Sequence, residues 1–308
     1  MLFENYCFRL EVTDRNIYKN LVVCIHGVNV TVKVGFLKLG NIASSPMLEF
    51  LLDERAERED IDVRVVGSGA KLGPSQAEEI AEKLLELNPD LVILTSPNAS
   101  LKGPMKAVEK IAGAGKPLIV VSDPPALKAK ERYEELGVGY IIVEADSMIG
   151  ARREFLDPAE MALFNANAIS LLACSGALNL LFNEIDKVID SIKKGEKPEL
   201  PRIKVTAKKA VEAAGFQNPY AKAKAMAAYE MAKNVAPITV KACFMEKDWE
   251  KYTLLCAEAH ELMQAAAALA LEAREIEKYG DTLRRTPHYD DGTILDKRKL
   301  IEKPRKPE

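Results

Sequence analysis

The chain has 308 residues, of which 48% are hydrophobic and 29% charged, a composition typical of a folded protein with a sizeable core. Its net charge of −3 and its aromatic content of 6% argue against a broad nucleic-acid-binding surface. No continuous apolar run reaches the roughly 18 residues of a membrane-spanning helix, and the best candidate, residues 20–40, is interrupted by His26, Asn29 and Lys33. Neither a nucleic acid nor a membrane is therefore expected as a partner.

The first residues and the cysteines indicate where the protein works. Residues 1–20 lack the basic start and the apolar centre of a secretory signal. The chain has five cysteines, an odd number, and their spacing is irregular. This pattern does not indicate a set of disulfides, so reduced thiols and a cytoplasmic location are predicted. No CxxC pair and no closely spaced pair of histidines is present, so no metal site is predicted.

The chain changes character after its first thirty residues. We interpret residues 1–30 as an N-terminal extension, with an added strand at residues 21–28 as the alternative. From Thr31 onward, β-branched and apolar runs alternate with segments of helical periodicity. The predicted strands occupy residues 31–39, 61–67, 90–98, 117–125 and 138–145. The predicted helices occupy residues 47–60, 73–88, 103–115 and 127–137. This alternation predicts βαβ units and a parallel sheet in a Rossmann-like α/β domain over residues 31–157.

After Pro158 the composition shifts towards alanine-rich helical segments. Helices are predicted at residues 159–195, 218–236 and 248–280. The first of these is either one long helix or two helices broken near Ser175 and Gly176. Short strands are predicted at residues 202–207 and 237–245. An Asp-Gly pair at residues 291–292 favours a hairpin turn ahead of a basic tail.

The fold class that follows is α/β, with a doubly wound, mostly parallel sheet, an attached helical bundle and a small C-terminal β segment. Residues 158–308 form the bundle with its short strands and basic tail.

In a doubly wound sheet, ligands bind beyond the carboxyl ends of the strands. The loops there expose backbone N–H groups next to helix N-termini, which suits anions. Their basic residues are Lys38, Lys71, Lys102, Lys106, Lys128, Arg152 and Arg153. These residues form either an electropositive crevice or ordinary solvated loop charges.

The motifs of several common enzyme classes are missing from these loops. No GxGxxG follows the first predicted strand of the sheet, and no GxxxxGK[ST] or GxSxG motif is present. The three histidines lie outside these loops. His260 lies on an apolar-rich helix, so a structural role is the simpler interpretation for it. A positive crevice without a metal signature or a nucleophile–base pair fits hydride transfer between two bound organic molecules, in which the protein orients the reactants.

Three motifs are specific enough to indicate a family. They are GARREFLDP at residues 150–158, LLDERAERED at residues 51–60 and NPYAKAKAMAA at residues 218–228. Together with VGFLKLGNIASS and LRRTPHYDDGTILDKRKL, they closely resemble the archaeal methylene-tetrahydromethanopterin dehydrogenases that depend on coenzyme F-420. The resemblance runs from about Thr31 to Lys303 and leaves the extension outside it.

The resemblance implies an enzyme of archaeal one-carbon metabolism, in methanogenesis or its reversal. It implies reversible hydride transfer between reduced coenzyme F-420 and methenyl-tetrahydromethanopterin, giving methylene-tetrahydromethanopterin. Coenzyme F-420 would be a dissociable co-substrate, with no metal and no bound flavin, and the chain would assemble as a homo-hexamer built from dimers. Both ligands would carry anionic tails, in agreement with the basic loops. The alternatives are a non-catalytic α/β binding protein of the same fold and a nicotinamide-dependent dehydrogenase.

The residues predicted to bind cofactor or substrate lie in the loops that follow the strands. They are Lys38, Asn41, Ser44, Pro97, Asn98, Asp123, Lys128, Arg152, Arg153 and Glu154. Relatives have GGPNPAAPGP where this chain has TSPNASLKGP, and GDAPG where it has SDPPA. No essential general acid or base is predicted, because the methenyl carbon is already electrophilic and accepts a hydride directly.

Simpler interpretations remain for several of these residues. The turn residues at positions 41 and 44 could serve only to turn the chain and cap a helix. Asp123 could cap the helix that follows it. Arg152 and Arg153 could pair with Glu154 or Asp157 rather than with a ligand.

Overall fold

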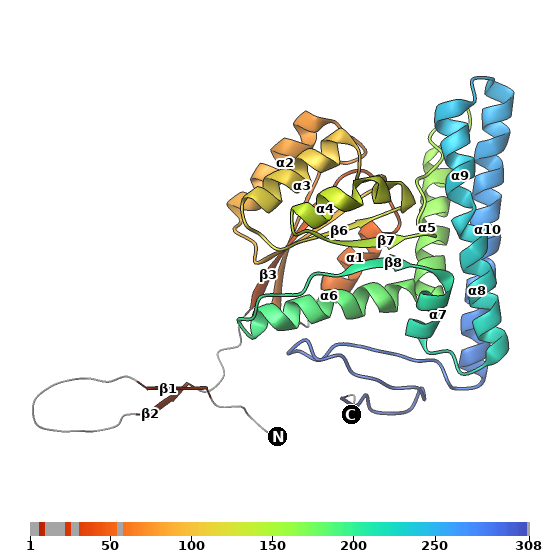
Figure 1. Ribbon diagram of the computed structural model, residues 1–308. Coiled ribbons are helices and arrows are strands. Elements are labelled where there is room, and N and C mark those ends of the chain that lie inside the picture. The colour runs from red at the N-terminus through yellow and green to blue at the C-terminus, as the bar shows by residue number, and fades with distance from the viewer. Residues whose placement is uncertain (1–5, 10–21, 26–30, 54–57, 307–308) are drawn as a thin grey trace, which may run out of the picture.

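The protein is described by a computed structural model that covers residues 6–9, 22–25, 31–53 and 58–306. Figure 1 shows a central sheet with helices on its faces, an upright layer of helices beside it, and a C-terminal segment that returns beneath α6. β1 (Tyr6–Arg9) and β2 (Val22–Ile25) pair antiparallel with each other and not with the central sheet. The rest of the predicted extension lies outside the described residues.

The central sheet has six parallel strands in the order β4-β3-β5-β6-β7-β8. The strands are β3 (Val32–Lys38), β4 (Ile61–Gly67), β5 (Leu91–Ser96), β6 (Leu118–Ser122), β7 (Gly139–Val143) and β8 (Arg202–Val205). β5, β6 and β7 are buried at every position, as expected where helices cover both faces. The predicted α/β fold is confirmed, and the short strand predicted at residues 202–207 is the edge strand β8.

Helices cover the two faces of the sheet. One face carries α1 (Ser44–Asp53) and α6 (Ala177–Lys193). The other carries α2 (Pro74–Glu86), α3 (Lys102–Gly113), η2 (Pro124–Ala129) and α4 (Lys130–Glu135). A hydrophobic core lies on each face of the sheet, and successive side chains of β3 pack into opposite cores. Phe36 packs on the α1 side and Leu37 on the α2 side. Because α1 and α2 lie on opposite faces, the winding of the sheet reverses between β3 and β5, which makes this the topological switch point.

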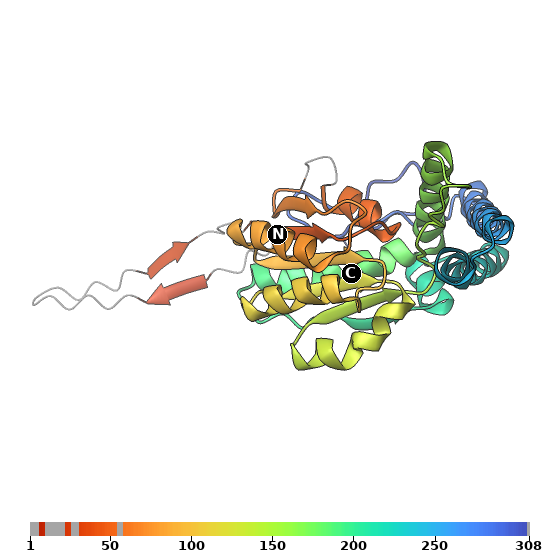
Figure 2. The same cartoon turned by 90° about the horizontal axis from the view of Figure 1, so that it is seen from above.

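The helical layer stands at one end of the sheet (Figure 2). Its helices are α5 (Pro158–Ser175), α7 (Ala207–Ala214), α8 (Pro219–Lys233), α9 (Val235–Val240), the π-helix η3 (Lys241–Met245) and α10 (Trp249–Tyr279). α10 packs along α5 and α8 through a stripe of buried alanines, which allows close approach. By length and mean hydropathy α10 could cross a membrane, and its contacts with α5 and α8 account for its apolar residues as part of a core.

The break between α5 and α6 has a steric cause. Gly176 adopts a φ of 97°, and a Cβ atom there would lie 2.1 Å from the carbonyl oxygen of Ala210. Only glycine fits this turn. The alternative of two helices in residues 159–195 is therefore confirmed.

The structure corrects three sequence predictions. Residues 237–245, predicted as a strand, are helical, and the helix α7 was not predicted. The β-branched residues of this segment favour a strand locally, but Val235, Thr239 and Ala242 are buried at helical spacing. The helix predicted at residues 47–60 begins three residues earlier, at the start of α1, and residues 58–60 are not helical.

Candidate functional site at the carboxyl edge of the sheet

Three loops meet at the switch point, where β3, β4 and β5 end. The turn after β3 contains Gly40, whose φ is 76°. A Cβ atom there would lie 2.9 Å from Leu72 and 3.1 Å from Pro97. Glycine thus allows the loops after β4 and β5 to approach the turn. The backbone N–H of Gly40 donates to the carbonyl oxygen of Gly69 and joins the turn to the loop after β4. The close approach of Pro97 to Gly40 places the loop after β5 beside the turn that contains Asn41.

Asp146, which follows β7, caps the N-terminus of α1 from another loop. Its Oδ1 accepts a hydrogen bond from the backbone N–H of Ala43 at 2.8 Å, and its Oδ2 accepts one from Ser44 at 2.9 Å. The carboxyl group is fully buried, and burial raises its pKa. Two N–H groups that would suit a ligand anion are therefore already occupied. Ser44 is itself buried, while Asn41 is exposed.

The turn after β5 is held by side chains from the loop after β6. Asp123 Oδ1 accepts a hydrogen bond from the backbone N–H of Asn98 at 2.6 Å, and Ser122 Oγ accepts one from Ala99 at 3.1 Å. Burial, opposed by the bond from Asn98 and reinforced by the charge of Asp146, raises the pKa of Asp123 to about 6. Asp123 stands at the N-cap position of η2, but its side chain makes no capping bond there.

The predicted lysines fall into two groups. Lys38 Nζ lies 2.6 Å from Glu49 Oε2 on α1, and Lys106 pairs with Glu78. The exposed side chains of the other loop lysines have no ion pair or hydrogen bond with any residue that the structure describes. These are Lys71, Lys102 and Lys128. Uncompensated positive charge beside the switch point is suited to anionic groups.

Arg152 ties its loop to the helical layer. Its guanidinium donates to the carbonyl oxygens of Ala242 at 3.1 Å and Glu246 at 3.2 Å, and it lies 4.4 Å from the ring centre of Tyr252. Glu154 shares a hydrogen bond with the same tyrosine. Arg153 differs, because its side chain is 94% exposed and lies 3.6 Å from Glu154. Arg152 thus braces the loop, whereas Arg153 extends into solvent.

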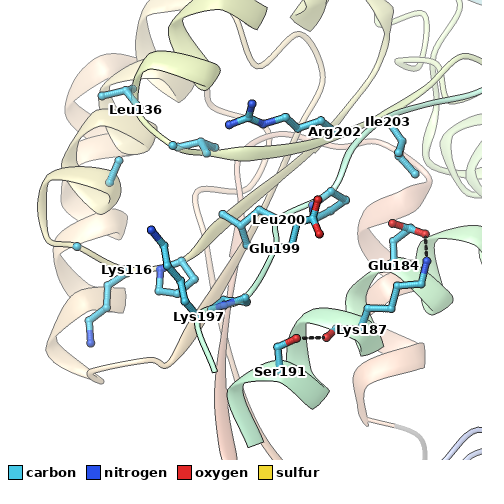
Figure 3. A pocket seen from close by; sticks show the side chains of 17 residues that line it. Lys116, Leu136, Glu184, Lys187, Ser191, Lys197, Glu199, Leu200, Arg202 and Ile203 are labelled. Carbon is cyan, nitrogen blue, oxygen red and sulfur yellow. Dashed lines mark hydrogen bonds and ion pairs between the residues drawn. The ribbon is translucent and has the colours of Figure 1, made fainter. Parts of the chain in front are cut away.

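A groove of about 950 Å³ lies at the opposite, amino edge of the sheet (Figure 3). It is formed by the starts of β6, β7 and β8 and by α6. Its charged lining consists of Lys116, Glu184, Lys187, Lys197, Glu199 and Arg202. None of the predicted site residues lines it.

Sequence reasoning missed Asp146 and Ser122, which organise the carboxyl edge. Both stand in loops that the strand pattern marked as ligand loops, which was the available signal. Their partners could not be inferred, because Asp146 and Ala43 are 103 positions apart.

His260 lies on α10, beside the end of the loop that follows β7. Its ring packs 4.7 Å from Phe155 and 4.6 Å from Phe164, and its Nδ1 lies 3.2 Å from Glu160 Oε2. This environment fits a structural role. Among the residues that the structure describes, no three His, Cys, Asp or Glu side chains gather as a metal site.

The parallel sheet and its switch point define a doubly wound α/β protein, a class that binds ligands beyond the carboxyl ends of its strands. Comparison with known proteins identifies the family. The family model described as methylene-5,6,7,8-tetrahydromethanopterin dehydrogenase matches residues 32–305, and the chain belongs to this family.

Individual relatives agree with the family assignment. An F-420-dependent methylenetetrahydromethanopterin dehydrogenase of Archaeoglobus fulgidus is 61% identical over 275 residues, which cover 89% of this chain and 100% of the relative. The relative of the same description from Methanothermobacter marburgensis is 53% identical over 275 residues, with the same coverage of both chains. A solved structure of such an enzyme, in complex with methylene-tetrahydromethanopterin and coenzyme F-420, matches with a TM-score of 0.87 and 44% identity, covering 89% of this chain and 100% of that chain. The resemblance seen in the motifs is confirmed, and with it the class of F-420-dependent oxidoreductase.

Proposed function

We propose that the chain catalyses, in the cytoplasm, reversible hydride transfer between reduced coenzyme F-420 and methenyl-tetrahydromethanopterin, giving methylene-tetrahydromethanopterin. The observation that carries this proposal is the match to a solved relative that holds both ligands, at 44% identity over the whole of that chain. The reaction would serve archaeal one-carbon metabolism, in methanogenesis or its reversal. Coenzyme F-420 would bind and leave as a co-substrate.

The carboxyl edge of the sheet offers what such a reaction needs from a protein. Its loops are joined by backbone N–H groups that donate to the side chains of Asp123, Ser122 and Asp146, and these bonds keep the turns in place before a ligand binds. Pre-organisation of this kind lowers the entropic cost of aligning two reactants. The free ammonium groups of Lys71, Lys102 and Lys128 would meet the phosphate and carboxylate groups of the ligand tails.

No protein group needs to protonate the hydride acceptor in this reaction, and the proton that reduced F-420 loses together with the hydride would pass to water. The methenyl carbon is flanked by two nitrogens that share its positive charge, so it accepts a hydride without prior activation. The buried carboxyl groups of Asp123 and Asp146 are both bound to backbone N–H groups, which fits a positioning role. Single substitutions at this edge should change affinity and alignment more than the chemical step.

A spectroscopic assay tests the proposal. Purified protein is mixed with reduced F-420 and methenyl-tetrahydromethanopterin, and the absorbance of oxidised F-420 is followed, with NADH and NADPH as parallel donors. Growth of the oxidised F-420 band supports the proposal. Turnover with a nicotinamide alone would indicate the nicotinamide-dependent alternative, and silence with every donor would indicate a binding protein.

We also propose that the chain forms a homo-hexamer built from dimers. In the single chain, the helical layer exposes large apolar side chains to solvent. Exposed apolar surface of this kind is typical of a face that contacts another subunit. The exposed side chains include Phe244, Met245, Trp249 and Leu254. Light scattering coupled to size exclusion should give six protomers, and a monomeric mass would contradict this proposal.

A further inference from the structure

Asn98 has a backbone conformation that helix capping does not explain. Among the described residues, the non-glycine positions with positive φ are Asn88, Asn98 and Asp281. Asn88 and Asp281 stand just past the ends of α2 and α10, where a left-handed residue is common. Asn98, with a φ of 50°, lies between β5 and α3 at the switch point instead. Strain of this kind, away from helix ends, concentrates at ligand sites and must be held by its surroundings.

The neighbouring loop after β6 and a serine of the same turn hold this residue in place. Asp123 Oδ1 accepts the Asn98 N–H at 2.6 Å, and Ser122 Oγ accepts the next N–H, from Ala99, at 3.1 Å. The same hydroxyl of Ser122 donates to the carbonyl oxygen of Ser96 at 2.5 Å, and Ser100 Oγ donates to Asn98 Oδ1 at 2.5 Å. The backbone and one side-chain atom of Asn98 are therefore fixed from both sides.

The side-chain amide nitrogen of Asn98 is left without a hydrogen-bond partner among the described residues. The residue is only half-buried, so this donor is accessible at the edge where the loops after β3 and β5 meet. Asp123, in contrast, is 6% exposed and its Oδ1 is occupied. Within the described part of the chain, both groups keep one free hydrogen-bonding atom, and the more accessible of the two groups is the carboxamide.

We propose that Asn98 contacts a bound substrate by donating from its amide nitrogen to a carbonyl oxygen, and that Asp123 is a positioning residue that holds Asn98 through its backbone N–H. This inference rests on the proposed function. Both the pterin and the deazaflavin ring systems carry carbonyl oxygens, so separate KM values for the two substrates distinguish them. Asp123 itself does not touch the substrate in this arrangement.

Steady-state kinetics of three variants tests the inference. Asp123→Asn keeps an oxygen acceptor for the Asn98 N–H, and its kcat/KM should stay within about threefold of the wild type. Asp123→Ala removes the acceptor and should lower kcat/KM by about tenfold, the effect of about 1.4 kcal/mol. Asn98→Gly tolerates the left-handed conformation without strain. It should raise the KM of one substrate by about tenfold, with kcat nearly unchanged, because only the carboxamide is lost.

Asp90→Ala provides a matched control. Asp90 precedes β5, and its Oδ2 accepts a hydrogen bond from the backbone N–H of Lys33 on β3 at 2.8 Å. This is the same kind of bond between a carboxylate and a backbone N–H, but at the amino edge of the sheet. This variant should lower the melting temperature and leave KM and kcat at wild-type values. If Asp123→Ala behaves in the same way, the inference is overturned. It is also overturned if Asp123→Asn is as impaired as Asp123→Ala, because the carboxylate itself would then act on the substrate.

The wild type is assayed first, so that two kinds of failure stay separate. An inactive wild type would refute the proposed function and this inference with it. An active wild type whose Asn98→Gly variant keeps both KM values would refute only the substrate contact of Asn98.

Discussion

At the scale of single residues, Asp123 should make the stability of the protein depend on pH. Its pKa is raised from 3.8 to about 6, chiefly by burial. The folded chain therefore holds this proton at higher pH than the unfolded chain does. The free energy of unfolding should fall as the pH rises from about 4 to about 6 and should be level above that range as far as this group is concerned.

The variant Asp123→Asn tests this pH dependence, since an amide cannot ionise. At about pH 7.5 it should be more stable than the wild type by about 2–3 kcal/mol, because the wild type must keep a buried charge there. At about pH 4 most of this difference should disappear. Urea denaturation at both pH values measures it. A difference that is equal at the two pH values would mean that the Asp123 carboxyl is not titrating in this range.

The neighbouring arginines Arg152 and Arg153 should differ in their effect on stability. Arg152→Ala removes two hydrogen bonds to carbonyl oxygens of the helical layer and a stacking contact with Tyr252. We expect it to lower the free energy of unfolding by about 1–3 kcal/mol. Arg153→Ala is the control and should stay within about 0.5 kcal/mol of the wild type. Equal losses in urea denaturation would contradict the bracing role of Arg152.

At the scale of elements, the parallel strands could be predicted and the contacts between loops could not. β5, β6 and β7 are buried on both faces, so they appear in the sequence as continuous apolar runs between turn residues. The bond between Asp146 and Ala43 depends on how two loops meet in space, and no local pattern contains that information. Residues 237–245 are helical because they pack against α10, and this packing outweighs their local propensity for a strand.

The α5–α6 junction tests the steric reason for a helix break. Gly176→Ala would place a Cβ atom 2.1 Å from a carbonyl oxygen at a φ of 97°. Gly195, just after α6, also has a positive φ of 71°, but nothing lies within 4 Å of a Cβ atom there. Gly195→Ala should cost about 1 kcal/mol through backbone strain alone. Gly176→Ala should cost about 3 kcal/mol or more, because the clash adds to the strain. Equal midpoints of urea denaturation for the two variants would show that the junction relaxes.

At the scale of the whole molecule, a buried charge network joins three distant parts of the chain. Arg58 precedes β4, Asp186 lies on α6 and His288 lies in the C-terminal segment that returns beneath α6 (Figure 1). Arg58 donates to Asp186 Oδ1 at 3.0 Å and to Asp60 at 2.9 Å, and His288 Nε2 lies 2.8 Å from Asp186 Oδ2. Among the described residues, the C-terminal segment contains isolated β-bridges and no regular strand or helix, and α6 also bonds to it through Asn179 and Lys193. The network should therefore anchor the segment to the sheet and to α6.

Asp186→Ala should release this anchor. The substitution leaves the buried guanidinium of Arg58 with one carboxylate instead of two, and breaking a buried ion pair from one side costs about 3–5 kcal/mol. Asp190→Ala, one turn further along α6, removes a more exposed carboxylate that lies 3.7 Å from Lys193 and should cost less than about 1 kcal/mol. Limited proteolysis followed by mass spectrometry should show faster cleavage between residues 283 and 306 in Asp186→Ala. Cleavage there at the wild-type rate, despite a lowered stability, would mean that other contacts hold the segment and that Asp186 serves only the core beneath the sheet.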